Sequence, residues 1–298
     1  MKAVWGRAVH EVRLALVALQ FLTRVPVPAW VGFEPAWLQA CLRYFPLVGA
    51  GVGAFGAMVL LGASLWWPPL VAVGLSMAAT VWLTGGFHED GWADTCDGLG
   101  GAVSRERALE IMKDSRLGSY GSLGLVLLLG LKAAVLVSLV SPRSDELSLA
   151  QDSHIHQVLL GWTVMALIWG HATSRLVPVW LTAALPYAGD ADHAKAKPLA
   201  LQAAWPLVMA ATLVWALLAL ALMVWVQHQG WPVGTLWRTL GWSTALAVLV
   251  AVLVRRWLRR RLGGFTGDTL GASQQLSELA CLLAWLAVVH PVTWVRWP

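Results

Sequence analysis

The chain has 298 residues, of which 58% are hydrophobic and 12% are charged, and its mean hydropathy is +0.65. Soluble domains carry about 25% charged residues, so this composition excludes an ordinary soluble protein and indicates a polytopic membrane protein. The net charge of +5 is explained by basic loops on the cytoplasmic side of a membrane and calls for no nucleic acid partner. The three cysteines have no CxxC spacing, which argues against a disulfide framework and a thiolate zinc site.

Residues 9–23 form the first candidate helix. Its apolar core is short and contains a glutamine, and basic residues precede it. Because a spanning helix needs about 20 mostly apolar residues, we expect this helix to lie in the membrane interface or to enter it only partway. No small-residue cleavage site follows, so we expect the segment to be retained and not removed as a signal peptide.

Seven later stretches are long and apolar enough to cross a bilayer, namely residues 42–66, 68–87, 120–141, 156–180, 201–227, 240–257 and 272–291. No internal repeat or low-complexity linker separates them. The sequence therefore predicts an all-α polytopic membrane bundle of about seven transmembrane helices, with residues 1–298 as one membrane-embedded domain.

Basic residues concentrate in alternate loops. Residues 88–118, 182–200 and 255–271 contain Arg105, Arg107, Lys113, Arg116, Lys195, Lys197, Arg255, Arg256, Arg259, Arg260 and Arg261. The only lysines or arginines in the opposite loops and at the C-terminal end are Arg143, Arg238 and Arg296. With seven spans the three basic loops share one side, which the positive-inside rule predicts to be the cytoplasm.

A charged island follows the second predicted span. Seven of the sixteen acidic residues of the chain lie between Glu89 and Asp114. In a helix, the spacing of Asp90, Asp94 and Asp97 stacks three carboxylates on one face. Like charges at this density beside a membrane need a counter-ion, and hard cations such as Mg²⁺ take carboxylate oxygens together with substrate phosphates. The alternative is a solvated acidic helix end. Glu89 points off this face and is the weaker ligand candidate.

Two histidines and an arginine lie near these acids or within a predicted span. His88 could act as a general acid or base, or could only hydrogen-bond an aspartate. His171 leaves the same choice open. Arg175 lies in or beside a span, so it either has a buried partner or extends to the interface.

Basic and acidic residues farther along complete the candidate set. Lys113 and Arg116 follow a short amphipathic helix and could bind phosphate oxygens, although positive-inside anchoring is the alternative, which better explains Arg105 and Arg107. Asp268 stands where a helix N-cap is expected, so it is either a cap or a catalytic group. Glu278 lies about two turns into an apolar helix, where an uncompensated carboxylate is expensive and is a functional candidate.

Four segments together resemble the membrane cobalamin synthases, or adenosylcobinamide-GDP ribazoletransferases, of late vitamin B12 synthesis. They read FLTRVPVP at residues 21–28, TGGFHEDGWADTCDG at 84–98, LEIMKDSRLG at 109–118 and TGDTLGA at 266–272. The second and fourth are the most specific. The family pattern tolerates other residues at the position of Glu89, and this chain has Gln275 where some relatives have an acid.

The resemblance implies a specific reaction. Such proteins join adenosylcobinamide-GDP to alpha-ribazole or its 5'-phosphate and release GMP, with Mg²⁺. It implies that Asp90, Asp94 and Asp97 bind the metal and that Lys113 and Arg116 bind the pyrophosphate. It also implies proton transfer by His88, and it places Asp268 and Glu278 in the same cavity.

The resemblance further implies a bacterial inner-membrane protein whose active site faces the cytoplasm. Its partners would be the two small-molecule substrates and the lipid bilayer, without nucleic acid. A homo-oligomer and contacts with other late cobalamin-pathway enzymes stay open.

Other classes remain as alternatives. The residues from Asp90 also resemble the start of the CDP-alcohol phosphotransferase signature, but Asp94 stands where that signature has an arginine, and its later aspartate spacing is missing. A transporter would use Asp90, Asp94, Arg175 and Glu278 for ions or an anionic solute, yet the chain shows no paired halves with broken helices.

Overall fold

The computed structural model describes residues 2–141, 153–189 and 202–290. Arg143, Lys195, Lys197 and Arg296, which entered the topology argument, lie outside the described residues. The helices are α1 (Lys2–Leu22), α2 (Pro35–Ala40), α3 (Phe45–Ser64), α4 (Pro69–Thr84), α5 (Phe87–Leu99), α6 (Arg105–Lys113), α7 (Ser119–Val140), α8 (Ser153–Ala184), α9 (Trp205–His228), α10 (Val233–Arg261) and α11 (Gly267–Val289). The described ranges contain no strand, only one isolated bridge between Tyr187 and Phe265. The all-α prediction is confirmed.

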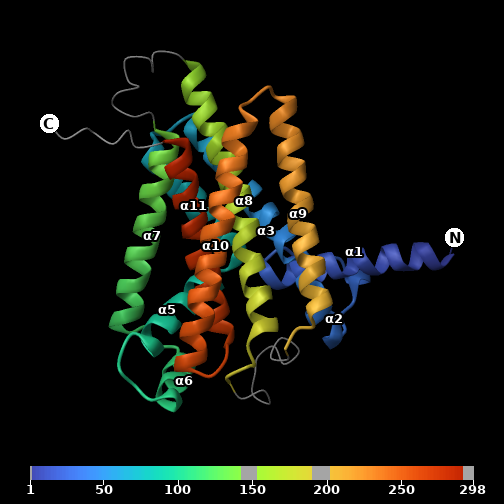
Figure 1. The fold of residues 1–298 in the computed structure, drawn as a ribbon, viewed down its shortest axis with the longest axis vertical. Helices are drawn as coiled ribbons and strands as arrows, with labels where there is room; N and C mark the ends of the chain where they lie inside the picture. The colour runs from blue at the N-terminus through green and yellow to red at the C-terminus, as the bar shows by residue number, and fades with distance from the viewer. Residues whose placement is uncertain (1, 142–152, 190–201, 291–298) are drawn as a thin grey trace.

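The long helices stand side by side in a bundle (Figure 1). Among the described residues, α7, α9, α10, α11 and the segment Pro35–Ser64 are each long and apolar enough to cross a membrane, and α4 with α5 makes up to six if that bent pair counts as one span. The remaining predicted span is α8, which packs against α3 and α11 inside the bundle. Its polar residues His171, Ser174 and Arg175 are all buried, so they face the interior of the bundle.

The first helix differs from the others in direction. Figure 1 shows α1 lying across the long axis of the bundle, and α1 is not among the helices that could cross a membrane. Its Glu11 accepts hydrogen bonds from Arg43 at 3.2 Å and from the Tyr44 hydroxyl at 2.6 Å, which attach the helix to the segment before α3. This arrangement agrees with the expected interfacial helix.

A sharp break separates α4 from α5. Gly85 and Gly86 both have positive φ angles, +81° and +73°, which side-chain-bearing residues rarely adopt. The two helices therefore meet at a bend of 89°. Arg24 lies against this break, since its backbone N–H donates to the Leu83 carbonyl at 2.8 Å. The acidic island thus begins a new helix and does not continue the second span.

The basic loops meet at one end of the bundle. The Arg105 guanidinium donates to the carbonyls of Leu262 at 2.7 Å and Ala188 at 3.0 Å. Arg261 donates to the Gly101 carbonyl at 2.9 Å. These bonds join the α5–α6, α8 and α10–α11 connections. Arg105, which the sequence explains by positive-inside anchoring, therefore also caps loop carbonyls at this end of the bundle.

Two glycines let α3 approach α8 closely. A Cβ at Gly53 would lie 2.8 Å from the Ile168 Cα atom, and one at Gly49 would lie 2.8 Å from Arg175 Cδ. Small residues four positions apart allow such backbone contact between membrane helices. The contact at Gly49 places α3 directly against the polar residues of α8.

We expect Gly53→Ala to destabilise the protein by about 1–3 kcal/mol, because the added methyl group would force α3 and α8 apart. The measurement is the midpoint of thermal unfolding of the purified protein in detergent. Gly51→Ala is the matched control, since a Cβ at Gly51 meets nothing within 4 Å. An equal effect of the two substitutions would contradict the tight α3–α8 contact.

Candidate functional site

The three aspartates of the island lie on α5 as predicted. That helix covers Phe87–Leu99, so the spacing of Asp90, Asp94 and Asp97 places them on one face. Asp90 is exposed, whereas Asp94 and Asp97 are half-buried. No group of three His, Cys, Asp or Glu side chains in the described part of the chain is arranged to hold a metal ion by itself. The row therefore does not form a closed protein cage for a metal within the described residues.

Asp97 has a defined structural role. Its two carboxylate oxygens accept the backbone N–H groups of Gly118 at 2.7 Å and Gly121 at 2.8 Å, at the start of α7. A negative charge at this position also interacts favourably with the helix dipole. A Cβ at Gly118 would lie 2.8 Å from Asp97 Cγ, so glycine leaves the space that the carboxylate needs. Asp97 thus caps α7, and its proposed metal contact would use the remaining lone pairs.

We expect Asp97→Ala to lower stability by about 1–3 kcal/mol, because two donors at the start of α7 lose a charged acceptor. Asp97→Asn keeps one acceptor oxygen, so its unfolding temperature should lie between those of Asp97→Ala and the wild type. Thermal unfolding monitored by tryptophan fluorescence measures both. If Asp97→Ala unfolded at the wild-type temperature, the capping role would be excluded and only a role in turnover would remain.

Asp268 lies at the crossing of α5 and α11. A Cβ at Gly91 would lie 2.7 Å from the Asp268 carbonyl oxygen, so the first turn of α11 touches α5 between Asp90 and Asp94. The N-cap of α11 is Thr266, whose hydroxyl accepts from the Thr269 N–H at 3.3 Å in a capping box. The N-cap interpretation of Asp268 is therefore wrong. Asp268 is the second helical residue, where the helix dipole favours a carboxylate.

The two basic candidates lie on the surface beside the island. Lys113 ends α6 and is exposed, and Arg116 follows it in the loop before α7. Arg116 binds the Asp114 carboxylate at 2.6 Å and 3.0 Å, and these hydrogen bonds lower the pKa of Asp114 to about 2. The side chains of Arg116 and Asp114 are both partly exposed. A surface ion pair contributes little free energy, so Arg116 can exchange its contact with Asp114 for one with a phosphate at little cost. Met112 and Ala108 of α6 pack against Gly98, which fixes α6 on α5.

The second group of candidate residues is buried. A polar cavity of about 10 Å³ lies between α4, α5, α7, α8 and α11, which is roughly the space that one water needs. It is lined by Thr80, Thr84, His88, Glu89, Lys132, His171, Arg175, Gln275 and Glu278. His88 and Glu278, two of the predicted residues, thus line the same cavity. The ring of His88 contacts the ring of Phe87 at a tilt of 31°, with centroids 3.9 Å apart.

Glu278 is the centre of an ion-pair network. It is 2% exposed, and its Oε1 atom lies 2.5 Å from Lys132 Nζ. Its other oxygen lies 3.2 Å from His171 Nδ1 and 3.9 Å from Arg175 Nη1. The Gln274 amide also donates to this oxygen at 2.6 Å. Two cations therefore compensate the carboxylate in the apolar bundle, as a buried charge requires.

Arg175 does not extend to the interface, since it is 2% exposed and bonds His171 Nδ1 at 3.0 Å. The alternative of a buried partner is the correct one. Lys132 was not among the candidate residues. The signal for it was a single lysine in the otherwise apolar stretch 120–141, which by itself marks a buried ion pair. His171 joins the same network.

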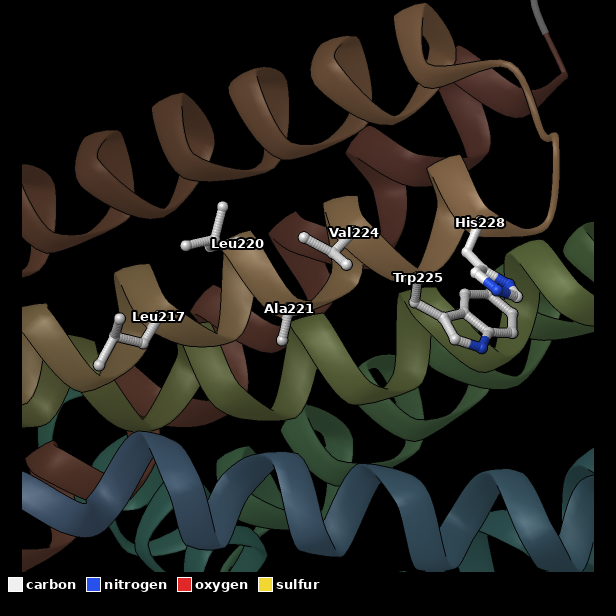
Figure 2. Close-up of a pocket in the computed structure, with 6 residues that line it drawn as sticks. All are labelled: Leu217, Leu220, Ala221, Val224, Trp225 and His228. Atoms are coloured by element: carbon white, nitrogen blue, oxygen red, sulfur yellow. The ribbon is translucent and has the colours of Figure 1, made fainter.

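An apolar hollow on α9 holds none of the predicted residues. Figure 2 shows it lined by Leu217, Leu220, Ala221, Val224, Trp225 and His228. Only Val208, Ala211 and Val226 are buried on α9, as expected for a lipid-facing helix. Its lining offers one imidazole, one indole N–H and otherwise carbon surface.

The comparisons with known proteins identify the family of the chain. The cobalamin-5-phosphate synthase family matches residues 14–286. An adenosylcobinamide-GDP ribazoletransferase of Leptothrix cholodnii is 57% identical over 94% of this chain and 97% of its own. Proteins of the same name from Polaromonas naphthalenivorans and Shewanella piezotolerans are 42% and 38% identical over 91% and 94% of this chain, and over 96% of their own length in both cases. No solved structure matches the chain. The chain therefore belongs to the cobalamin-5-phosphate synthase family and is an integral membrane transferase of cobalamin biosynthesis.

Proposed function

We propose that the protein transfers adenosylcobinamide phosphate from adenosylcobinamide-GDP to alpha-ribazole, or to its 5'-phosphate, and releases GMP. The observation that carries this proposal is the row of Asp90, Asp94 and Asp97 on one face of α5, beside the first turn of α11. A relative that is 57% identical bears the name adenosylcobinamide-GDP ribazoletransferase. The donor is a pyrophosphate, so its cleavage depends on positioning and on neutralisation of charge.

The residues on α5 fit Mg²⁺ with an incomplete protein ligand set. Mg²⁺ is usually bound by one or two carboxylates plus substrate phosphates and water. Exposed Asp90 and half-buried Asp94 offer such carboxylates, while Asp97 would contribute the lone pairs that α7 leaves open. When bound, the metal would neutralise charge on the phosphate oxygens and on the leaving GMP.

The other candidate residues then have separate tasks. A hydroxyl of the acceptor ribose attacks the phosphorus next to cobinamide, and the bond to the bridging oxygen breaks as GMP leaves. Lys113 and Arg116 would hold the pyrophosphate oxygens from the α6–α7 side. His88 would accept the proton of the attacking hydroxyl, which requires that the acceptor or a water reach the buried cavity that its ring lines. Asp268 would act from the first turn of α11, which touches α5 at Gly91. Glu278 would compensate the charges of Lys132 and Arg175 in the buried cavity.

We further propose that this end of the bundle faces the cytoplasm across a bacterial inner membrane. The support is the gathering of Arg105, Lys113, Arg116 and the arginines of α10 at the end that carries α5 and α6. Positively charged loops are retained on the cytoplasmic side. The donor carries the charged pyrophosphate of its GDP group, and it would reach the site from that side.

The test is GMP release by purified protein in lipid vesicles given adenosylcobinamide-GDP, alpha-ribazole and Mg²⁺. We expect GMP together with a new cobalamin product, and loss of both with EDTA. A CDP-alcohol donor runs in parallel. Release of CMP from that donor, without GMP from the corrinoid, would replace the proposal by lipid-headgroup transfer, and silence with both donors would reject it.

A further inference from the structure

One neutral side chain connects three helices across the buried cavity. Gln275 of α11 is 1% exposed, and its Oε1 atom accepts a hydrogen bond from Lys132 Nζ of α7 at 3.3 Å. Its Nε2 atom donates to Glu89 Oε1 of α5 at 2.9 Å. The amide thus links the ion-pair network around Glu278 to the helix that carries the aspartate row.

The chemistry of the two neighbours determines the orientation of this amide. A lysine ammonium only donates hydrogen bonds and an ionised carboxylate only accepts them. The oxygen of Gln275 must therefore face Lys132, and its nitrogen must face Glu89. Lys132 is itself held at 2.5 Å from Glu278, so the donor to the amide is fixed in place.

The start of α5 needs such a connection. Gly85 and Gly86 precede it with positive φ angles, and glycine restricts the rotation of a following helix less than any other residue. Glu89 lies in the first turn, between buried His88 and exposed Asp90. A bond to the Glu89 carboxylate therefore adds a fixed point for the rotation of α5 near its start, beyond the contacts of Gly91 with α11 and of Asp97 with α7.

We propose that Gln275 is a positioning residue for the transfer reaction: its hydrogen bond to Glu89 sets the rotation of α5, and with it the placement of His88 and the aspartate row. The expected effect on kcat rests on the proposed function, whereas the hydrogen bond from Gln275 to Glu89 does not. Gln275 touches neither substrate nor metal in this role. It acts through Glu89, and Lys132 orients it.

The first experiment compares steady-state kinetics of three variants in lipid vesicles. Gln275→Met keeps the volume and removes both hydrogen bonds, so we expect kcat to fall about 10- to 100-fold with KM changed less than about threefold. Glu89→Ala should show the same split. Glu89→Gln keeps an acceptor oxygen for the Gln275 amide and should restore most of kcat. The matched control is Gln227→Met on the exposed surface of α9, which should behave as the wild type.

The second experiment measures the position of α5 without turnover. Cys96 lies on α5 and is half-buried against α7, while Cys41 and Cys281 are buried and can be replaced by alanine. We expect a maleimide to label Cys96 several times faster in Gln275→Met than in the cysteine background alone. Gln227→Met again serves as the control.

The outcomes separate the inference from the proposed function. An inactive wild type would reject the proposed function, and the labelling rates would still test the connection. An active wild type with an unchanged kcat in Gln275→Met would overturn the positioning role. A lowered kcat with an unchanged labelling rate would overturn it too, because the loss would then not pass through α5. A lowered kcat in Glu89→Gln equal to that of Glu89→Ala would show that the Glu89 charge is required, and not its bond to Gln275.

Discussion

Replacing Asp94 by asparagine is expected to reduce turnover by a factor of about 1,000 while the protein still inserts and folds. Asp94 is the middle residue of the row on α5 and lies four residues after Asp90 and three before Asp97. Asparagine keeps the shape and one acceptor oxygen but removes the negative charge that a hard cation requires. Losses of this size are typical when a group that stabilises charge in the transition state is removed.

The measurement for Asp94→Asn is metal-dependent GMP release, with thermal unfolding as the check on folding. Glu110→Gln is the matched control, because Glu110 is exposed on α6 and pairs only at the surface with Arg107. The control should retain wild-type turnover. Retained turnover of Asp94→Asn at ordinary Mg²⁺ concentrations would remove Asp94 from the metal site.

Glu278→Ala is expected to destabilise the protein by about 3–5 kcal/mol, the usual result of removing one partner of a buried ion pair. The substitution leaves Lys132 and Arg175 without their carboxylate, and both side chains are almost fully buried. We expect little monodisperse protein after purification. Size-exclusion profiles and unfolding midpoints in detergent provide the measurement.

A second variant distinguishes charge burial from loss of packing. The double substitution of Glu278→Gln with Lys132→Met removes a charge of each sign, so it should recover much of the stability that Glu278→Ala loses. Glu110→Ala serves as the surface control. If Glu278→Ala unfolded at the wild-type temperature, the network would contribute nothing to the fold, and a catalytic role alone would explain the buried carboxylate.

Local spacing was sufficient to predict the row on α5. A helix needs only short-range information, and the positions of Asp90, Asp94 and Asp97 differ by one turn each. The same reasoning failed at the start of α11, because both Thr266 and Asp268 are suitable caps and only the backbone angles distinguish them. The capping of α7 by Asp97 could not be predicted, since it joins residues 21 and 24 positions apart.

The buried network shows a second limit. A charged residue in an apolar helix predicts that a partner exists but does not identify it, so Glu278 and Arg175 stood as separate candidates. Their meeting depends on the close contact of α3 with α8 and of α8 with α11, which is set by packing across the whole bundle. Gln275 carries no charge, so no rule about buried ions selects it. Only the geometry shows its place between Lys132 and Glu89.

The bend between α4 and α5 determines how deep the acidic residues lie. Had α4 continued straight, the seven positions from Asp90 to Asp97 would have spread the carboxylates over about 10 Å along the bundle axis. The turn of 89° instead sets the row at nearly a right angle to α4, so the three carboxylates differ little in height along the α4 axis. A bilayer that thickens or thins then covers or uncovers all three carboxylates together, so the hydration of the row changes as a unit and not residue by residue.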